Sequence, residues 1–362
     1  MDYAVIMAGG TGKRLWPLSR QNYPKQLLKL FQGESLLRKC FERLETIFDQ
    51  KRIFVLTNAR FVDLVRKRLP ELPEDNVIAE PVVRDTAGAI GLAAGVLAKA
   101  DPDATLAVVT ADQIIKPPEV YQNVLKDAIY FVNHNEQALV TFGVQPVFPS
   151  TQLGYIKIDN GKNYPGCGNL VHRVEAFKEK PDEQTAIEYI ESGCYLWNSG
   201  MFVWKAETIL KNLFHFLPEC REPLGKIQAD WNGPNRQKTL EEWFVKLPQT
   251  SIDYAVMEKA ENVFAVRLAC HWLDLGSFRA LSDVIKADEN NNVLVAGFTE
   301  ILDSKNNIVV TEDERHLFAF IGLDNMVVAH TSDVTLVCRR EDCYRLKELL
   351  EQVRLHTSET FL

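Results

Sequence analysis

The chain has 362 residues, of which 46% are hydrophobic and 25% are charged. This length suits one large α/β domain with a small second one, and the composition is that of an ordinary globular protein. The formal net charge of −8 argues against a general binder of nucleic acids or membrane surfaces, because such proteins carry a basic excess. A few basic side chains in one cleft would still accommodate a small anionic substrate.

The chain contains seven cysteines and no Cys-x-x-Cys pair, so neither a disulfide framework nor a zinc ribbon is indicated. The first residues lack the basic segment and the long apolar run of a signal peptide. No apolar stretch reaches the roughly 18 residues that are needed to span a membrane. We therefore expect a cytoplasmic protein that has no membrane and no nucleic acid among its partners.

Strand-like and helical segments alternate along the first 285 residues. Short apolar runs rich in β-branched residues predict buried parallel strands at Tyr3–Met7, Arg52–Leu56, Leu106–Thr110 and Ala138–Phe142. Amphipathic segments between and after these runs predict helices at Ser35–Phe48, Ala59–Leu69, Thr86–Ala100 and Pro118–Asn133. The alternation indicates a doubly wound α/β sheet, whose ligands gather at the carboxyl ends of the strands.

From about Asn290 the pattern changes to short apolar runs separated by turn residues. The runs are Val293–Val295, Ile308–Val310, Leu317–Leu323, Met326–Ala329 and Val334–Cys338. They predict a small all-β unit of stacked turns, closed by a helix over Glu341–Leu355; a continuation of the main sheet is the alternative. We place the boundary at the polar cluster Asp288–Asn292, which gives a first domain over residues 1–287 and a second over residues 288–362.

The first predicted strand runs into a loop that contains three glycines, Ala8-Gly9-Gly10-Thr11-Gly12-Lys13-Arg14. Glycines let the backbone approach a ligand closely and present N–H groups to phosphate oxygens. A Walker A loop would need Gly at position 7 and Ser or Thr at position 14, and a dinucleotide fingerprint would need a small residue at position 15. The chain meets neither set of conditions, so neither motif is present. Lys25 adds a third positive charge to those of Lys13 and Arg14, which suggests a triphosphate with a leaving pyrophosphate; a tight turn with solvated charges is the alternative.

These residues, together with several later motifs, resemble a known family. The run Gly9–Arg20, followed by Pro24-Lys25-Gln26, is similar to the signature of mannose-1-phosphate guanylyltransferases. The resemblance continues in order through Glu80-Pro81, Arg84–Ile90, Phe177–Pro181, Trp197–Phe202, Ser251–Lys259 and Trp272–Ser277. It implies a Rossmann-like, doubly wound mixed-sheet nucleotidyltransferase domain with a small C-terminal left-handed β-helix-like domain. It also implies an enzyme that transfers GMP from GTP to mannose 1-phosphate and releases pyrophosphate.

The chain departs from the family's pattern at three places. Family members have Arg-Asn-Thr-Ala-Pro-Ala-Ile where this chain has Asp85 and Gly88, and they have Asp-His where it has Asp112 and Gln113. A Gly-Tyr-Gly-Tyr run is replaced here by Gln152–Tyr155. Another sugar 1-phosphate, such as that of glucose or a heptose, is therefore an alternative substrate.

Two aspartates are candidate metal ligands. Asp112 follows a predicted strand at the edge where ligands bind, and Asp274 lies far along the chain in Trp-Leu-Asp-Leu-Gly-Ser. Mg²⁺ prefers one or two carboxylates together with phosphate oxygens and waters. For each aspartate alone, a turn former or a helix cap is the more common role. The resemblance implies that the pair holds Mg²⁺ against the α-phosphate of GTP.

The resemblance also assigns roles to the remaining site residues. The implied catalytic residues are Arg14, Lys25, Asp112 and Lys180. The implied nucleotide contacts are Ala8, Gly9, Gly10, Thr11, Gly12, Lys13, Arg14, Glu80, Asp85, Thr86 and Ala87, and the implied sugar contacts are Gly154, Glu179, Asn198 and Asp253. On a strand, Glu179 and Lys180 would form an ordinary surface pair instead, and Asp253 would suit a helix N-terminus equally well.

Glu80 is the candidate that reads the guanine base. Guanine presents two adjacent donors, N1–H and the N2 amino group, on one edge, and a carboxylate can accept both. Adenine offers an N1 acceptor at the same position and would be disfavoured. A solvated glutamate at a strand end is the alternative for Glu80.

Two other functions compete with this interpretation. An NAD-dependent oxidoreductase on a similar sheet is disfavoured by the broken dinucleotide fingerprint. A non-catalytic regulatory subunit that binds a sugar nucleotide is disfavoured because Arg14, Lys25, Asp112 and Asp274 are all present. We also expect a homodimer, because the apolar runs of the tail need a partner surface against which to bury.

Overall fold

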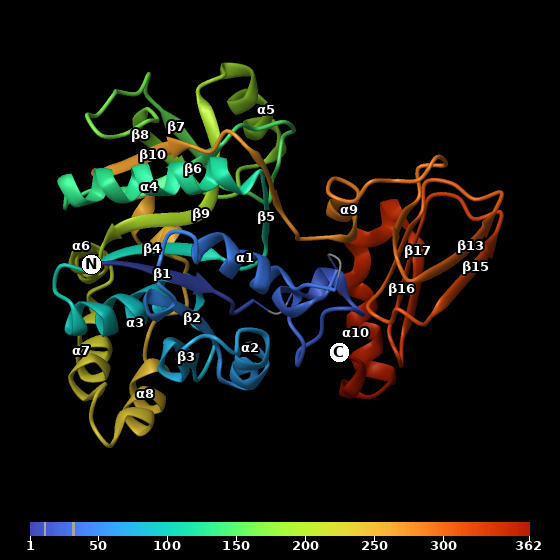
Figure 1. Ribbon diagram of the computed structural model, residues 1–362, viewed down its shortest axis with the longest axis horizontal. Coiled ribbons are helices and arrows are strands. Elements are labelled where there is room, and N and C mark those ends of the chain that lie inside the picture. Colours follow the sequence, from blue (N-terminus) through green and yellow to red (C-terminus); the bar gives the residue numbers. More distant parts are fainter. Residues whose placement is uncertain (11, 31–32) are drawn as a thin grey trace.

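The larger part of the molecule is built on a mixed sheet of nine strands, seen in a computed structural model that describes residues 1–10, 12–30 and 33–362 (Figure 1). The strands follow the order β3-β2-β1-β4-β9-β6-β10-β8-β7. Their bounds are β1 Asp2–Met7, β2 Ile53–Asn58, β3 Val77–Glu80, β4 Thr105–Thr110, β6 Leu139–Val144, β7 Tyr155–Ile158, β8 Val171–Lys178, β9 Tyr195–Lys205 and β10 Val263–Arg267. β1 pairs in parallel with β2 and β4, whereas β9 runs antiparallel to β4 and β6. The predicted mixed α/β sheet is confirmed.

Helices cover both faces of this sheet. One face packs against α1 (Leu36–Leu44), α2 (Val62–Arg68) and α4 (Pro118–His134), and the other against α3 (Asp85–Ala100), α6 (Ala206–Phe216), α7 (Arg221–Asp230) and α8 (Arg236–Phe244). A further helix, α5 (Glu183–Ser192), precedes β9. The four predicted strands and four predicted helices of this region are all present, with ends shifted by a few residues.

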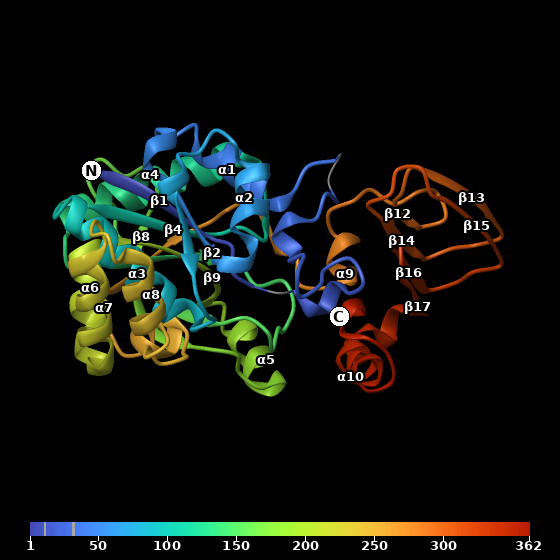
Figure 2. The ribbon, with the colours of Figure 1, turned by 90° about the horizontal axis from the view of Figure 1, so that it is seen from below.

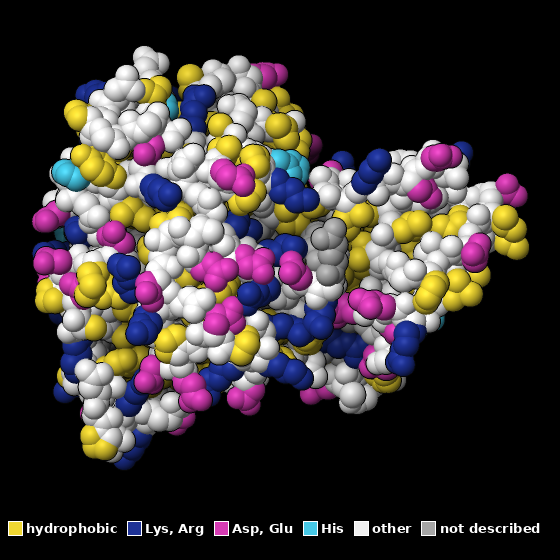
Figure 3. All heavy atoms as spheres, viewed as in Figure 1, with side chains coloured by type: hydrophobic (Ala, Val, Ile, Leu, Met, Phe, Trp, Pro, Cys, Tyr) yellow, Lys and Arg dark blue, Asp and Glu magenta, His cyan; other side chains and the backbone are white. Residues whose placement is uncertain are grey.

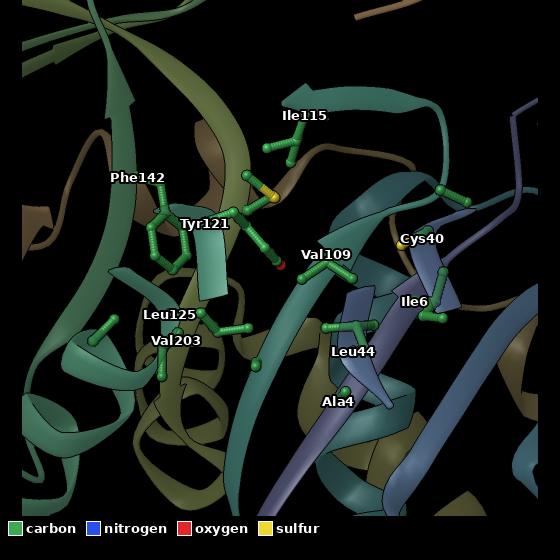
Figure 4. Packing of buried hydrophobic residues seen from close by; sticks show 14 of the residues in the cluster. Ala4, Ile6, Cys40, Leu44, Val109, Ile115, Tyr121, Leu125, Phe142 and Val203 are labelled. Carbon is green, nitrogen blue, oxygen red and sulfur yellow. The ribbon is translucent and has the colours of Figure 1, made fainter. Parts of the chain in front are cut away.

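The alternation of side chains along β1 explains the two-sided packing. Successive residues of a strand point to opposite faces, so Ala4 and Ile6 enter one core while Tyr3 and Val5 enter the other. Figure 4 shows the first of these cores, where Ile6 lies near Leu44 and Val109 from the neighbouring elements. Burial on both faces leaves only the strand ends free to carry chemistry.

A short antiparallel pair lies outside the main sheet and joins distant parts of the chain. It consists of β5 (Gln113–Lys116) and β11 (His271–Asp274), and its register sets Gln113 opposite Asp274. Leu275 N donates to Asp112 O at 3.1 Å and continues the pairing. The two predicted metal-ligand segments are therefore fixed to each other by backbone hydrogen bonds.

The tail forms a separate β-helix-like unit. One of its sheets holds β12 (Val293–Val295), β14 (Ile308–Thr311), β16 (Met326–His330) and β17 (Thr335–Arg339), and the other holds β13 (Phe298–Leu302) and β15 (Leu317–Ile321). In Figure 2 these strands lie at the end of the molecule away from α6 and α7. The predicted unit of stacked turns is confirmed, and the alternative of a continued main sheet is wrong.

Two features of the tail differ from the prediction. β13 was not predicted, because the polar residues Thr299 and Glu300 interrupt the apolar residues of Phe298–Leu302, so the segment forms no apolar run. The helix expected over Glu341–Leu355 is a 3₁₀ segment at Arg340–Arg345 followed by α10 at Leu346–His356.

Buried asparagines hold the successive turns of the tail together. The side chains of Asn292 and Asn307 are both fully buried. Asn307 donates from Nδ2 to Asn292 Oδ1 at 2.9 Å and to Leu323 O at 2.8 Å, and its Oδ1 accepts from Met326 N at 2.9 Å. The asparagine clusters that marked turns in the sequence thus supply an internal hydrogen-bond ladder.

We expect Asn307→Leu to destabilise the tail. The substitution leaves Met326 N without its partner at a buried position, and an unsatisfied group of this kind costs about 1–3 kcal/mol. Leu323 O loses one of its two donors and keeps Lys305 N at 2.9 Å. Thermal unfolding should therefore begin at lower temperature. Asn325→Gly is the control, since Asn325 has φ 58° and glycine adopts that conformation freely. An unchanged unfolding curve for Asn307→Leu would show that the ladder adds no stability.

The tail packs against the segment that follows the glycine loop. Trp16 Nε1 donates to Phe361 O at 2.6 Å, and Arg20 pairs with Asp333 at 2.5 Å. Leu15 and Leu28 share a hydrophobic cluster with residues of β12, β14, β16 and α10. Among the described residues, the helices include none with the length and apolar character that crossing a bilayer requires.

Candidate active site

The glycine loop leaves the carboxyl end of β1, where neighbouring groups crowd it closely. Ala8 uses both backbone polar groups internally, since its N–H donates to Leu56 O at 2.8 Å and its carbonyl accepts from Thr57 Oγ1 at 3.0 Å. A Cβ on Gly9 would lie 3.1 Å from Oε2 of Glu80. The loop is thus held against β2 and β3, and it leaves Ala8 only apolar contacts for a nucleotide.

Gly12 shows why this loop requires glycine. Its φ of 63° is a conformation that other residues rarely adopt, and a Cβ there would lie 2.8 Å from Cβ of Lys25. The loop therefore folds directly onto the Lys25 side chain. The predicted contacts of Thr11, and those of the Lys13 side chain, lie outside the described part of the chain.

Lys25 bridges the two predicted metal ligands. Its Nζ lies 2.8 Å from Oδ2 of Asp112 and 3.3 Å from Oδ1 of Asp274, and the side chain is only 13% exposed. Burial alone would lower the pKa of Lys25, but the two carboxylates more than offset burial and hold the pKa above its ordinary value. Burial raises the pKa of Asp274; the charge of Lys25 acts to lower that pKa, and the charge of Asp112 acts to raise it.

Arg14 approaches the same cluster from the glycine loop. The Arg14 side chain is exposed. A Cβ added to Gly276 would lie 3.5 Å from Oδ2 of Asp274 and 3.7 Å from Nη1 of Arg14. Its charge acts to lower the pKa of Asp274. Arg14, Lys25, Asp112 and Asp274 are therefore brought together, as the sequence predicted.

The two aspartates fit a hard divalent cation. Both carboxylates reach one ammonium nitrogen, so they face a common point beside the glycine loop. Within the described ranges, no cluster of three or more His, Cys, Asp or Glu side chains is placed to hold a metal. A pair of carboxylates completed by substrate phosphates and waters is the arrangement that Mg²⁺ commonly takes in such sites.

Glu80 ends β3 next to the glycine loop. Its side chain is 7% exposed, and burial, with a smaller contribution from Asp85, raises its pKa to about 7. A buried carboxyl beside Gly9 is unlike the solvated strand-end glutamate that was the alternative. Its position agrees with a role at the nucleotide.

The start of α3 is tied to the segment before Asp253. Asp85 has φ 60° and accepts from Thr86 N at 2.6 Å through its own Oδ1. Thr86 Oγ1 accepts from Ile252 N at 2.8 Å, and Ala87 N donates to Thr250 O at 3.2 Å. The amides of Thr86 and Ala87 are thus used within the protein.

The predicted sugar contacts form a second cluster. Asn198 Nδ2 donates to Oδ1 of Asp253 at 2.9 Å, and Asn198 N donates to Gly154 O at 2.8 Å. Burial, and next the charge of Glu179, raise the pKa of Asp253 to about 7. Asp253 begins a π-helical segment (Asp253–Met257), a local distortion that is frequent at functional sites. Gly154, Glu179, Asn198 and Asp253 are therefore all adjacent.

Glu179 and Lys180 do not lie on a strand, which was the premise of the surface-pair alternative. β8 ends at Lys178, and Lys180 has φ 48°, so the chain turns where the strand was expected to continue. The two side chains form an ion pair with each other, in which Glu179 is 8% exposed and Lys180 is 51% exposed. The carboxylate is thus held inside the site while the ammonium reaches solvent.

We expect Gly154→Ala to impair use of the sugar substrate. A Cβ at this position would overlap Oε2 of Glu179, so the carboxylate must move. A misplacement of this kind can cost on the order of 100-fold in rate. The KM for the sugar phosphate should rise, with the KM for GTP unchanged. Gly225→Ala is the matched control, because nothing lies within 4 Å of its added methyl. Equal kinetics for the two variants would remove Gly154 from the sugar site.

Three residues at the site were not predicted. Glu258 Oε1 accepts from Glu179 N at 2.9 Å and fixes the turn that follows β8. Gln113 and Trp272 bond to each other between β5 and β11. Glu258 and Trp272 lie inside motifs that resemble those of the family, and their place in these motifs could have identified them as site residues. Gln113 differed from the family's pattern, and that difference was the signal at its position.

Comparison with known proteins agrees with this geometry. The Nucleotidyl transferase family profile matches residues 3–291, and that of the MannoseP isomerase/GMP-like beta-helix domain matches residues 301–353. The chain is 38% identical over 350 residues to mannose-1-phosphate guanylyltransferase from Klebsiella pneumoniae, covering 96% of this chain and 73% of that protein. It is 36% identical over 358 residues to mannose-1-phosphate guanylyltransferase RfbM from Salmonella typhimurium, covering 97% and 72%.

A solved structure matches over nearly the whole chain. It is described as mannose-1-phosphate geranyltransferase from Thermus thermophilus, with a TM-score of 0.85, 33% identity, and coverage of 98% of this chain and 99% of that one. Both lobes of the molecule are therefore shared with a known protein. The site geometry, the two matching profiles and the similar proteins together show that this chain belongs to the nucleotidyl transferase family, among the mannose-1-phosphate guanylyltransferases.

Proposed function

We propose that this protein transfers GMP from GTP to mannose 1-phosphate by in-line attack, giving GDP-mannose and pyrophosphate. The observation that carries the proposal is the cluster of Lys25, Asp112 and Asp274 beneath a glycine loop. Around it lie a buried carboxyl suited to guanine, at Glu80, and a set of amide and carboxylate groups suited to sugar hydroxyls.

The nucleophile needs no strong base, because a phosphate oxygen of the sugar 1-phosphate is already anionic. Catalysis then depends on positioning and on neutralising charge. Lys25 would place a positive charge between the phosphates of the two substrates, and Arg14 with the loop amides would stabilise the departing pyrophosphate. Asp112 and Asp274 would hold Mg²⁺, which supplies Lewis-acid stabilisation of the α-phosphate.

The sugar phosphate would be oriented by carboxylate, amide and ammonium side chains. Asp253 and Glu179 are acceptors for hydroxyls, and Asn198 is positioned by Asp253 and by Thr141 Oγ1, which donates to Asn198 Oδ1 at 2.8 Å. Lys180 is half exposed and lies beside Glu179, so it can reach a sugar phosphate that enters from solvent.

A panel of sugar 1-phosphates against the four NTPs and dTTP, read by pyrophosphate release, tests the function. We expect the highest rate with mannose 1-phosphate and GTP, and no reaction when the sugar phosphate is omitted. Preference for glucose 1-phosphate or a heptose 1-phosphate would keep the reaction and change the substrate. No pyrophosphate from any pair would overturn the proposal and favour a regulatory sugar-nucleotide binder.

We further propose that the protein is a homodimer that pairs through the tail. The outward face of β13 and β15 exposes Phe298, Leu302, Leu317 and Ile321, which lie in adjacent pairs because Phe298 is opposite Leu317 and Leu302 is opposite Ile321. Hydrophobic side chains gather on this lobe in Figure 3. The Glu300–Ala319 pair lies between them on the same face. Exposed apolar side chains gathered in this way mark an interaction site. Light scattering should give a dimer for the native chain and a monomer for Leu302→Lys with Ile321→Lys.

Two further points belong to the proposal. The domain division at residues 287 and 288 is supported by the turn at Asp288–Asn292, where Asp288 accepts from Asn290 N and Asn292 N. All seven cysteines are free thiols, which supports a reducing, cytoplasmic location.

A further inference from the structure

Gln113 joins the two clusters of the site, although no role was predicted for it. It follows Asp112 directly, is 5% exposed, and lies opposite Asp274 in the β5–β11 pair. Its Oε1 accepts from Trp272 Nε1 at 2.9 Å, and its Nε2 donates to Ser199 O at 2.5 Å. One side chain therefore connects the segments that carry Asp112, Asp274 and Asn198.

The orientation of the Gln113 amide is fixed by its partners. The indole nitrogen of Trp272 can only donate, and the carbonyl of Ser199 can only accept. The amide therefore has one arrangement that satisfies both, and a rotated amide would set donor against donor and acceptor against acceptor. A carboxylate at this position could not donate to Ser199, and an aliphatic side chain could serve neither partner.

The Ser199 carbonyl is available because β9 is irregular at this point. The register between β6 and β9 shifts between the pairs Thr141–Phe202 and Gly143–Asn198, and Gly200 has φ 71°. The bulge turns Ser199 O toward Gln113 and sets Asn198 toward Asp253. The position of Asn198 thus depends on how the bulge is held.

We propose that Gln113 is a positioning residue, whose amide sets the metal-binding carboxylates Asp112 and Asp274 at a fixed position relative to the sugar-binding Asn198. This inference rests on the proposed function for the identity of the two substrates. Such partners of ligand-bearing segments are commonly worth about 10- to 100-fold in metal affinity or activity. Glu80, the proposed guanine contact, lies beside Gly9 at the end of β3, a strand that does not belong to the β5–β11 pair.

The test compares Gln113→Leu with the native protein in three constants and one binding measurement. We expect the Mg²⁺ concentration for half-activation and the KM for mannose 1-phosphate each to rise about 10-fold or more, while the KM for GTP changes less than about 2-fold. Binding of Mn²⁺, followed by electron paramagnetic resonance without turnover, should weaken in parallel. Gln228→Leu is the matched control, since Gln228 Nε2 donates to Gly95 O at 2.9 Å far from the site.

The outcomes separate this inference from the proposed function. If the native protein releases no pyrophosphate, the function fails, and the Mn²⁺ measurement on Gln113→Leu still tests the positioning role. If the native protein is active but Gln113→Leu keeps its metal and sugar constants, or changes them no more than Gln228→Leu does, the inference is overturned.

Discussion

Asp112→Asn and Asp274→Asn should each lower kcat by about 100-fold or more, because a bound metal supplies several kcal/mol of transition-state stabilisation. Each substitution removes one of the two carboxylates that would hold the cation, and each leaves Lys25 with a single anionic partner. The fold should survive. The pKa of Asp274 is already raised by burial, so a neutral amide of the same shape suits its surroundings.

Pyrophosphate release measured across a Mg²⁺ titration, together with thermal unfolding, checks this expectation. The variants should need more Mg²⁺ for whatever activity remains, at nearly native melting temperatures. Asp283→Asn is the matched control, since it removes an exposed carboxylate nine residues after Asp274. Near-native turnover with an unaltered Mg²⁺ requirement in either active-site variant would show that its aspartate is not a ligand.

Much of the fold followed from local pattern, and the exceptions have physical reasons. The buried strands and their helices are recognisable from apolar periodicity, because both faces of the sheet are covered. β13 was missed because polar residues interrupt its apolar ones, and one of its faces is open to solvent. The turn after β8 was missed because neither Glu179 nor Lys180 signals the left-handed backbone that Lys180 adopts.

The site was predictable as a set of residues but not as a set of contacts. Motif order placed Asp112 and Asp274 together, yet only the β5–β11 register shows how backbone pairing fixes them. The ion pairs of Lys25 with both aspartates join segments that are far apart in sequence, and no local pattern encodes such a contact. Gln113 illustrates the same point, since its importance lies in two partners that no spacing rule connects to it.

Glu80→Gln should reduce the preference for GTP over ATP by about 10- to 150-fold, the equivalent of the roughly 1.5–3 kcal/mol that hydrogen bonds to a charged group contribute. In the proposed binding mode, the native carboxylate would accept from both guanine donors and repel the adenine N1 lone pair. The glutamine amide has a donor for adenine N1 and an acceptor for the adenine amino group. The ratio of kcat/KM for the two nucleotides isolates this effect, because GTP and ATP share every phosphate contact.

The same ratio should depend on pH in the native protein and not in the variant. Because burial raises the pKa of Glu80 to about 7, the carboxylate is present above pH 7 and the neutral acid predominates below it. The neutral acid, like the glutamine amide, has a donor for adenine, so selectivity for GTP should be full near pH 8.5 and should fall as the pH drops through about 7. Since kcat/KM reports the ionisation of the free enzyme, the midpoint should lie near that pKa. A ratio that is constant from pH 6 to 8.5 and unchanged in Glu80→Gln would assign base recognition to backbone groups of the loop instead.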